Sequence, residues 1–187
     1  MVAVPFSKKN ILIGVCGGIA VYKICDLINK LKYKGANVEV IMTGNATKFV
    51  TPLTFQTLSG NRVYVDMFEL ISKETLEIDH ISLAEKCDLL VIAPATANII
   101  GKIASGIADD LLTTVVLSTK APILIAPAMN TNMWANKIVM NNVKKLKSLG
   151  FKFIGPSYGM LACGKKGLGR LEEIDKIMAE IKKILKG

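Results

Sequence analysis

Four short apolar runs of this chain end in residues that a simple turn does not require. Their ends read GVCGGIA at 14–20, MTGNA at 42–46, APATAN at 93–98 and PAMNTNMW at 127–134. Short runs that are apolar on both faces are typical of strands buried in a parallel sheet. Ligands of such sheets bind outside the carboxyl ends of the strands. The sequence therefore predicts that these four ends build one ligand site.

Strand-like and helix-like patterns alternate along the whole chain. Strands are expected at residues 11–16, 38–42, 88–93, 122–126 and 151–154. Helices are expected at 19–31, around Phe49 and Phe55, at about 97–118 and 133–148, and from about 172 to 185. This order predicts a doubly wound, Rossmann-like α/β fold, in which helices cover both faces of a parallel sheet. A length of 187 residues fits one domain, spanning 1–187, with a full core.

Two stretches follow neither pattern. Residues 60–79 are mixed and acidic, and we interpret them as an excursion before a helix that begins near His80. Residues 155–170, GPSYGMLACGKKGLGR, are rich in glycine and are interpreted as a long loop. Long loops in compact domains usually carry function, often as lids, so this segment is expected to cover the site.

Composition and charge restrict the partners of the protein. The net charge of +9 invites a nucleic-acid interpretation, but the lysines lie mostly on expected helix exteriors and lack interleaved aromatic residues. A solvated basic surface that attracts anionic small molecules fits better. No apolar stretch is long enough to span a bilayer, so no membrane association is expected. Residues 8–20 imitate a signal peptide without a cleavage site, which favours a cytoplasmic protein.

The four cysteines lack the spacing of a metal site, so no metal is expected and free thiols are favoured. Cys16, Cys25 and Cys87 fall on or beside expected strands and helices, which predicts that they are core residues. Cys163 lies in the glycine-rich loop, where a small buried residue and a reactive thiol are equally good interpretations. His80 is the only histidine; it could be structural, but it precedes the 88–93 strand and is expected near the same crevice.

Glycines follow the first strand, where they allow backbone amides and a helix N-terminus to approach a ligand. Gly14, Gly17 and Gly18 have the spacing GxxGG, which departs from the GxGxxG of dinucleotide-binding folds, and a plain tight turn remains an alternative.

The end of the second strand distinguishes the nucleotide classes. A NAD site needs an acidic residue there, whereas this chain has Thr43, Gly44 and Asn45. Hydroxyl, amide and backbone donors at a helix start suit a terminal phosphate. The pattern favours FMN as the cofactor and argues against a NAD-dependent dehydrogenase.

Taken in order along the chain, these motifs resemble the flavin-containing cysteine decarboxylases. The resemblance rests on PATAN at 94–98, PAMN-x-x-MW at 127–134, ACG-x-x-G-x-G at 162–169 and a histidine ahead of the third strong strand. Each motif alone is weak, but the ordered set covers nearly the whole chain and is specific.

The resemblance implies roles for particular residues. It implies that the flavin is lined by Gly17, Gly18 and Ile19, that its phosphate is held by Thr43, Gly44 and Asn45, and that further cofactor contacts come from Thr96, Ala97, Asn98, Ile99 and Ala128. It also implies that His80 is the essential catalytic histidine, that Asn130 binds the region of the substrate carboxylate, and that Cys163 is a catalytic proton donor.

The implied reaction is FMN-dependent decarboxylation of 4'-phosphopantothenoyl-L-cysteine to 4'-phosphopantetheine in coenzyme A biosynthesis. An acylated cysteine has no free amine for a Schiff base, so another electron sink is needed. A flavin can accept hydride from the carbon that bears sulfur, which gives a thioaldehyde whose carboxylate is placed like that of a β-keto acid. Loss of carbon dioxide then leaves an enethiol, which is reduced when the flavin returns the hydride and Cys163 supplies the proton.

The resemblance also implies partners. Family members form homo-oligomers, as trimers or dodecamers, and in many bacteria the domain is fused to a synthetase. This chain departs from many relatives by having Thr96 for serine, Ile99 for threonine, and Lys165 and Lys166 where an acidic residue commonly follows Gly164. The added cations could favour a phosphorylated substrate.

Three alternatives remain in view. A decarboxylase of a peptide's C-terminal cysteine would share the flavin but stop at the enethiol, so the match around Cys163 disfavours it. A flavin prenyltransferase would share the fold, but the PAMN segment argues against it. A non-catalytic interaction or regulatory subunit would be expected to lose His80, Asn130 or Cys163, and all three are present.

Overall fold

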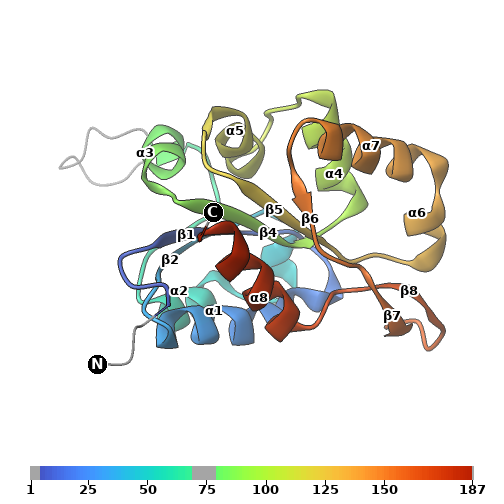
Figure 1. Cartoon of the computed structure of the whole chain (residues 1–187), viewed down its shortest axis with the longest axis horizontal. Coiled ribbons are helices and arrows are strands. Elements are labelled where there is room, and N and C mark those ends of the chain that lie inside the picture. The colour runs from blue at the N-terminus through green and yellow to red at the C-terminus, as the bar shows by residue number, and fades with distance from the viewer. Residues whose placement is uncertain (1–4, 69–78, 187) are drawn as a thin grey trace.

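The computed structural model describes residues 5–68 and 79–186. Six parallel strands form one sheet in the order β3-β2-β1-β4-β5-β6 (Figure 1). Their bounds are β1 Asn10–Val15, β2 Asn37–Met42, β3 Val63–Tyr64, β4 Leu89–Ala95, β5 Ile123–Pro127 and β6 Lys152–Phe153. The strand order reverses between β1 and β4, and a crevice forms at such a reversal in open α/β sheets. The predicted doubly wound α/β fold is therefore confirmed.

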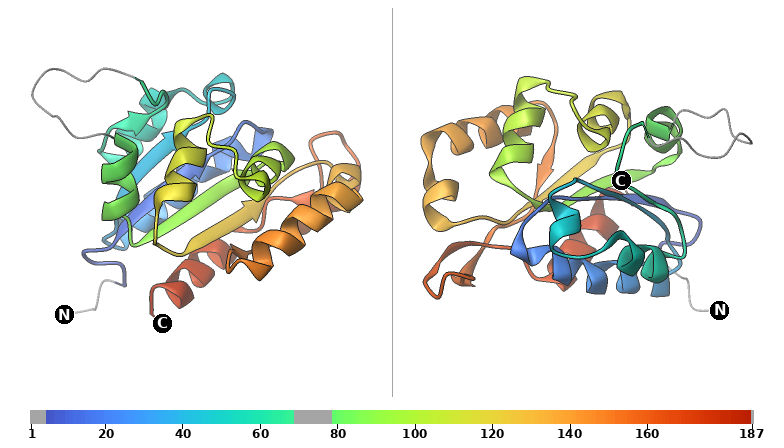
Figure 2. Two further views of the ribbon diagram at one scale, coloured as in Figure 1. Left: turned by 90° about the horizontal axis from the view of Figure 1, so that it is seen from above. Right: turned by 180° about the vertical axis from the view of Figure 1, so that it is seen from behind.

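Helices cover both faces of the sheet, as Figures 1 and 2 show. One face carries η1 (Ile19–Lys23), α1 (Ile24–Tyr33), α2 (Pro52–Ser59) and α8 (Ile174–Ile184). The other carries α3 (Asp79–Lys86), α4 (Ala97–Ser105), α5 (Leu111–Ser118) and α7 (Lys137–Ser148), with α6 (Thr131–Ala135) at its end. Successive residues of β1 point to opposite faces, so Ile11 and Ile13 join one core while Leu12 joins the other. None of the described helices is long and apolar enough to cross a membrane.

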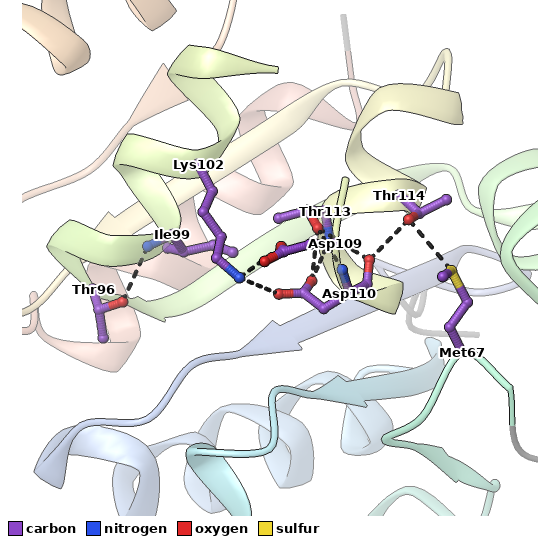
Figure 3. A network of polar contacts seen from close by, with 8 residues as sticks. All are labelled: Met67, Thr96, Ile99, Lys102, Asp109, Asp110, Thr113 and Thr114. Carbon is purple, nitrogen blue, oxygen red and sulfur yellow. Dashed lines mark hydrogen bonds and ion pairs between the residues drawn. The ribbon is translucent and has the colours of Figure 1, made fainter. Parts of the chain in front are cut away.

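The expected helix over 97–118 is two helices, because two capping signals interrupt it. Gly106 ends α4 in the left-handed conformation, and Asp110 starts α5 by accepting hydrogen bonds from the backbone and side chain of Thr113. Figure 3 shows Lys102 of α4 reaching across this break to Asp109 and Asp110, at 2.7 and 3.0 Å. The two helices are thus tied together behind the sheet.

Other helix and strand boundaries in the structure also differ from those expected. The expected helix over 133–148 is divided at Asn136, which caps α7. Phe49 lies at the end of a short η2 turn (Ala46–Lys48), outside α2, which begins only at Pro52. Residues 60–79 contain β3, whose two residues are too short to show an alternating pattern. Part of that stretch, 69–78, lies outside the described residues.

The expected loop over 155–170 is a β-hairpin. Strands β7 (Ser157–Met160) and β8 (Lys166–Arg170) pair in an antiparallel ladder, which projects from the sheet beside α6 in Figure 1. Its glycines made the segment look like a loop. Gly167 and Gly169 are instead buried at alternate positions of β8, on the face that meets the start of α6. The interpretation as an irregular loop was therefore wrong.

Candidate active site at the carboxyl edge of the sheet

A cavity of about 680 Å³ lies where the sheet ends and the hairpin begins. Three of the four expected strand ends line it, through residues 17–20, 96–97 and 128–130. The hairpin closes another side with residues 160–163 and 169–171. The volume falls in the range of small-molecule and cofactor pockets, roughly 300–1,000 Å³. The crevice predicted from the strand ends therefore exists, with a wall that the sequence did not predict.

The glycines after β1 serve two different purposes. Gly14 lies within β1, and a Cβ there would come 2.5 Å from Cδ1 of Leu112, so this glycine accommodates the packing of α5. Gly18 lines the cavity, and a Cβ there would meet only Cγ2 of Thr96, at 3.9 Å. A side chain at position 18 would consequently grow into the cavity. Gly14 is thus a packing residue rather than part of the ligand loop.

The fourth strand end lies beside the cavity without lining it. A Cβ on Gly17 would come 2.5 Å from Cβ of Asn45, so the 43–45 segment packs directly behind the glycine turn. The Thr43 amide donates to the carbonyl of Val15 at 3.0 Å. The amides of Gly44 and Asn45 donate to no other described residue, and both residues are exposed. Two adjacent free amides can hold an anion, so the phosphate role remains a prediction for this segment.

The start of α4 brings two of its four expected cofactor residues to the cavity. Thr96 is the N-cap, accepting at Oγ1 from the Ile99 amide at 3.3 Å, and Thr96 and Ala97 line the cavity. Asn98 is exposed outside the cavity. The Ile99 side chain is buried in the core, because helical geometry turns it toward the sheet. Side-chain contacts of Asn98 and Ile99 with a ligand in this cavity are therefore not supported.

Asn130 is fixed at the start of α6. Its Oδ1 accepts from the Asn132 amide at 2.8 Å, which leaves the amide nitrogen free to donate to a ligand. Asn130 lines the cavity, as does Ala128, whose amide is held by the carbonyl of Ala95 at 2.9 Å. The segment after β5 thus places a rigid hydrogen-bond donor at the cavity wall.

Cys163 stands in the turn of the hairpin and lines the same cavity as Asn130. The two segments are joined through their backbones, because the Met129 amide donates to the carbonyl of Gly169 at 2.9 Å. A Cβ on Gly169 would collide with the Met129 carbonyl oxygen, and Gly169 has a φ of 153°, which favours glycine. Glycine therefore allows β8 to pack directly on the Asn130 segment, and the position of Cys163 is tied to it.

His80 is not brought to this cavity. It lies at the beginning of α3, partly exposed, and the cavity-lining residues in the described part of the chain do not include it. The expectation that it lies at the same crevice does not hold within one chain, because α3 packs on α5, away from the hairpin. Its catalytic role stays a prediction.

Two cations line the cavity that the sequence did not single out, Lys23 and Arg170. Burial and the neighbouring Arg170 lower the pKa of the Lys23 ammonium below its ordinary value. Arg170 is paired with Glu173, with Nη2 and Oε1 3.0 Å apart. Arg170 directly follows Gly169, and Lys23 lies five residues after Gly18; this closeness to the glycine segments is a signal that sequence reasoning could have used.

The thiols also separate by environment. Burial raises the pKa of Cys16 to about 12, and burial likewise raises the pKa values of Cys25 and Cys87. These thiols stay protonated at neutral pH and are poor nucleophiles. Cys163 is exposed at the cavity. No group of three or more potential metal ligands occurs among the described residues.

Comparison with known proteins places this architecture in a family. The model of the family described as Flavoprotein matches residues 3–186. The chain belongs to the flavoprotein family. Coenzyme A biosynthesis bifunctional protein CoaBC is 52% identical over 172 residues in Bacillus subtilis and 49% identical in Borreliella burgdorferi. Each match covers 92% of this chain but only 42% and 43% of the relative, so the chain spans less than half of these curated relatives.

Solved flavoprotein structures share the fold over nearly the whole chain. A cysteine-to-serine mutant of PPC decarboxylase, complexed with pantothenoylaminoethenethiol, superposes with a TM-score of 0.86 at 30% identity, covering 96% of this chain and 99% of that one. The epidermin biosynthesis protein EpiD from Staphylococcus aureus gives a TM-score of 0.78 at 32% identity, covering 92% and 99%.

The cavity of this flavoprotein fits a flavin. The opening beside Gly18 offers a cradle that any side chain would fill. Ile19, Ala97, Ala128 and Met129 give the cavity apolar walls suited to a flat aromatic ring system, and the free amides of residues 44–45 lie next to the glycine turn.

Proposed function

We propose that this chain is an FMN-binding decarboxylase domain that converts 4'-phosphopantothenoyl-L-cysteine to 4'-phosphopantetheine in coenzyme A biosynthesis. One observation carries the proposal: Asn130 and Cys163 line the same cavity as Gly18 and Thr96. A hydrogen-bond donor for a carboxylate and a thiol thus face the space that fits a flavin. The bifunctional coenzyme A biosynthesis proteins and the PPC decarboxylase among its relatives support the substrate.

FMN, when bound, supplies reversible two-electron chemistry at the carbon that bears the substrate sulfur. Gly17, Gly18 and Ile19, with Ala97 and Ala128, form the wall against which the cofactor lies. The free amides of residues 44–45 would hold its phosphate. These groups bind and orient, and none of them takes or gives a proton.

The substrate carboxylate is held by Asn130. The Nδ2 group donates to it, while the hydrogen bond from the Asn132 amide keeps the Asn130 side chain in place before substrate arrives. Lys23 and Arg170 add positive charge to the same cavity and favour an anionic ligand. Carbon–carbon cleavage requires the bond to this carboxylate to stand perpendicular to the plane of the thioaldehyde, so that its electron pair can pass into the C=S group.

Cys163 completes the reaction. Its thiol carries the proton that the enethiol carbon takes up as it becomes saturated. The backbone hydrogen bond between β8 and Met129 ties the hairpin to the Asn130 segment, so that the Cys163 thiol and the Asn130 side chain can act on the same substrate molecule. A decarboxylase that stops at the enethiol would not need this proton donor.

We also propose that the protein self-assembles and that a second copy supplies His80. His80 is absent from the cavity of its own chain, and the cavity mouth exposes large apolar side chains, with Ile19, Tyr22 and Met160 each more than half exposed. Burial of such a rim between copies is favourable. Further proposed features are a cytoplasmic location and partnership with a synthetase domain or protein, which the bifunctional relatives support.

The direct test is to purify the protein, record its visible spectrum, and follow carbon dioxide release from 4'-phosphopantothenoylcysteine. A yellow protein that yields phosphopantetheine is the expected result. A yellow protein that acts only on a peptide ending in cysteine would replace the substrate assignment. A colourless protein that cannot be reconstituted with FMN would overturn the enzyme assignment.

Self-assembly is tested by mixing two inactive variants. His80→Asn and Asn130→Ala subunits should each be inactive alone yet regain part of the activity after co-refolding, because some mixed sites contain both native residues. If the mixed subunits form a hetero-oligomer but no mixture regains activity, His80 either acts in the site of its own chain or has no part in the active site.

A further inference from the structure

A second cavity shares Asn130 and Cys163 with the first. It has a volume of about 230 Å³ and lies between the turn of the hairpin and the start of α6. Asn130, Leu161 and Cys163 line both cavities, so the two spaces meet at these residues. A ligand whose reacting end lies at Asn130 and Cys163 therefore has two directions in which to extend.

The second cavity differs chemically from the first. Beyond the shared residues, its lining consists of Thr131, Asn132, Lys165 and Lys166. Neither ammonium group forms an ion pair with any residue that the structure describes. No described aspartate or glutamate lines this cavity. Two unneutralised cations and the amide side chain of Asn132 thus line a small hollow, and donors of this kind suit a phosphate monoester.

The hairpin holds the two lysines where they are. The Leu161 amide donates to the carbonyl of Lys165 at 2.9 Å, and the Gly164 amide donates to that of Leu161 at 3.0 Å, which closes the turn around Cys163. Lys166 begins β8 and is paired with Met160. The backbone that positions Cys163 is therefore the backbone that positions the basic pair.

We propose that the second cavity is a phosphate subsite, in which Lys165 and Lys166 bind the phosphorylated end of the substrate. The choice of substrate rests on the proposed function. That substrate has an anion at each end, and Asn130 takes the carboxylate at the cysteine end. The first cavity has largely apolar walls and fits the flavin, so the second cavity is the polar exit for the phosphorylated arm. Lys165 and Lys166 thereby make the hairpin select for the phosphorylated substrate.

The test compares the FMN-loaded wild-type protein with K165A/K166A on pantothenoylcysteine with and without its 4'-phosphate. The expected result is a fall of about 10- to 100-fold in kcat/KM for the phosphorylated substrate, with little change for the unphosphorylated one. K165R/K166R should recover most of the preference. K32A/K34A is the matched control, because it removes the same charge from exposed lysines at the end of α1.

A binding measurement separates this proposal from the proposed function. Calorimetric titration with 4'-phosphopantothenate and with pantothenate, neither of which can be decarboxylated, should show a preference for the phosphorylated compound that K165A/K166A abolishes and K32A/K34A retains. An equal loss in both double variants would mean that only overall charge matters and would overturn the subsite. An unchanged preference in K165A/K166A would also overturn it. Wild-type protein that binds phosphopantothenate selectively but decarboxylates neither substrate would refute the proposed function and leave the subsite standing.

Discussion

The cavity has two walls that are built in different ways. The core wall comprises residues 17–20, 96–97 and 128, which follow buried strands, and behind it every residue of β4 is buried. The hairpin wall comprises residues 160–163 and 169–171, and two side chains of β7, Tyr158 and Met160, are 69% and 56% exposed. Hydrophobic burial therefore stabilises the core wall, whereas the hairpin wall depends on backbone contacts with the segment after β5.

This difference assigns separate tasks to the two walls. A cofactor that stays bound through many turnovers needs a wall whose shape is fixed by the core of the fold. Substrate recognition and proton delivery depend on individual side chains, and these can be substituted in the hairpin wall without loss of the fold. Substitutions in the hairpin wall should accordingly alter individual reaction steps, while substitutions in the core wall should alter FMN binding or stability.

The largest expected effect is that of Cys163→Ser in the hairpin wall. Formation of saturated product should fall by about 10²- to 10⁴-fold, because the proton donor is lost, while carbon dioxide is still released. Product analysis by mass spectrometry distinguishes the enethiol from phosphopantetheine. Cys87→Ser is the control, because that thiol contacts the Ala84 carbonyl and the Thr119 hydroxyl and a serine can keep both hydrogen bonds. Wild-type rates of saturated product in Cys163→Ser would refute the assigned role.

Gly18→Val tests the core wall. The added side chain would occupy the cradle, and FMN affinity should fall by about 100-fold or more with little loss of stability. Fluorescence titration of FMN into the apoprotein measures the effect. Gly101→Ala is the matched control, because its Cβ would meet only Nδ2 of Asn142, at 3.8 Å, outside the cavity. Full FMN affinity in Gly18→Val would show that the flavin lies elsewhere.

Gly169→Ala tests whether the hairpin wall acts independently of the core wall. The new Cβ would collide with the Met129 carbonyl, so β8 must shift and carry Cys163 away from Asn130. We expect kcat/KM to fall by about 10- to 100-fold through misplacement, with FMN affinity nearly unchanged. Leu168→Ala is the control, since it alters the neighbouring residue on the exposed face of β8. An equal fall in FMN affinity would show that the hairpin wall and the core wall do not act independently.

The same difference explains what the sequence could and could not predict. The core wall was predicted because continuous apolar runs identify buried parallel strands, and because ligands bind at their carboxyl ends. The hairpin was missed because Gly167 and Gly169 contribute backbone contacts, which an alternation of side chains cannot reveal. The motif also does not predict the direction in which each side chain points. Ile99 was therefore assigned to the cofactor, although its side chain faces the core.

The other omissions have similar physical causes. Lys23 and Arg170 are two of 24 basic residues, and their closeness to the glycine segments does not by itself show that their side chains reach the cavity. The position of His80 depends on how α3 packs and on any neighbouring copy of the chain. The spacing of residues within a motif predicts neither of these. Motif order was enough to predict the family, whereas contacts between distant segments were needed to define the site.

The smallest expected effect is that of Asp110→Ala, which loosens the connection behind the core wall. Asp110 caps α5 and pairs with Lys102, so its loss should reduce the free energy of unfolding by about 1–2 kcal/mol at neutral pH. Although burial opposes ionisation, the Thr113 amide and Lys102 together hold the pKa of Asp110 below its ordinary value.

A lowered pKa in the folded state fixes the pH dependence of this contribution. The carboxylate stabilises the fold at any pH above the ordinary range for aspartate, and the stabilisation is lost as the pH falls through the lower folded pKa. Urea unfolding should therefore show a difference between wild type and Asp110→Ala at neutral pH that shrinks in strong acid. Asp109→Ala is the matched control, because Asp109 shares Lys102 but caps no helix, and it should cost less than about 1 kcal/mol. Equal losses in the two variants would mean that the ion pair, and not the cap, holds α4 to α5.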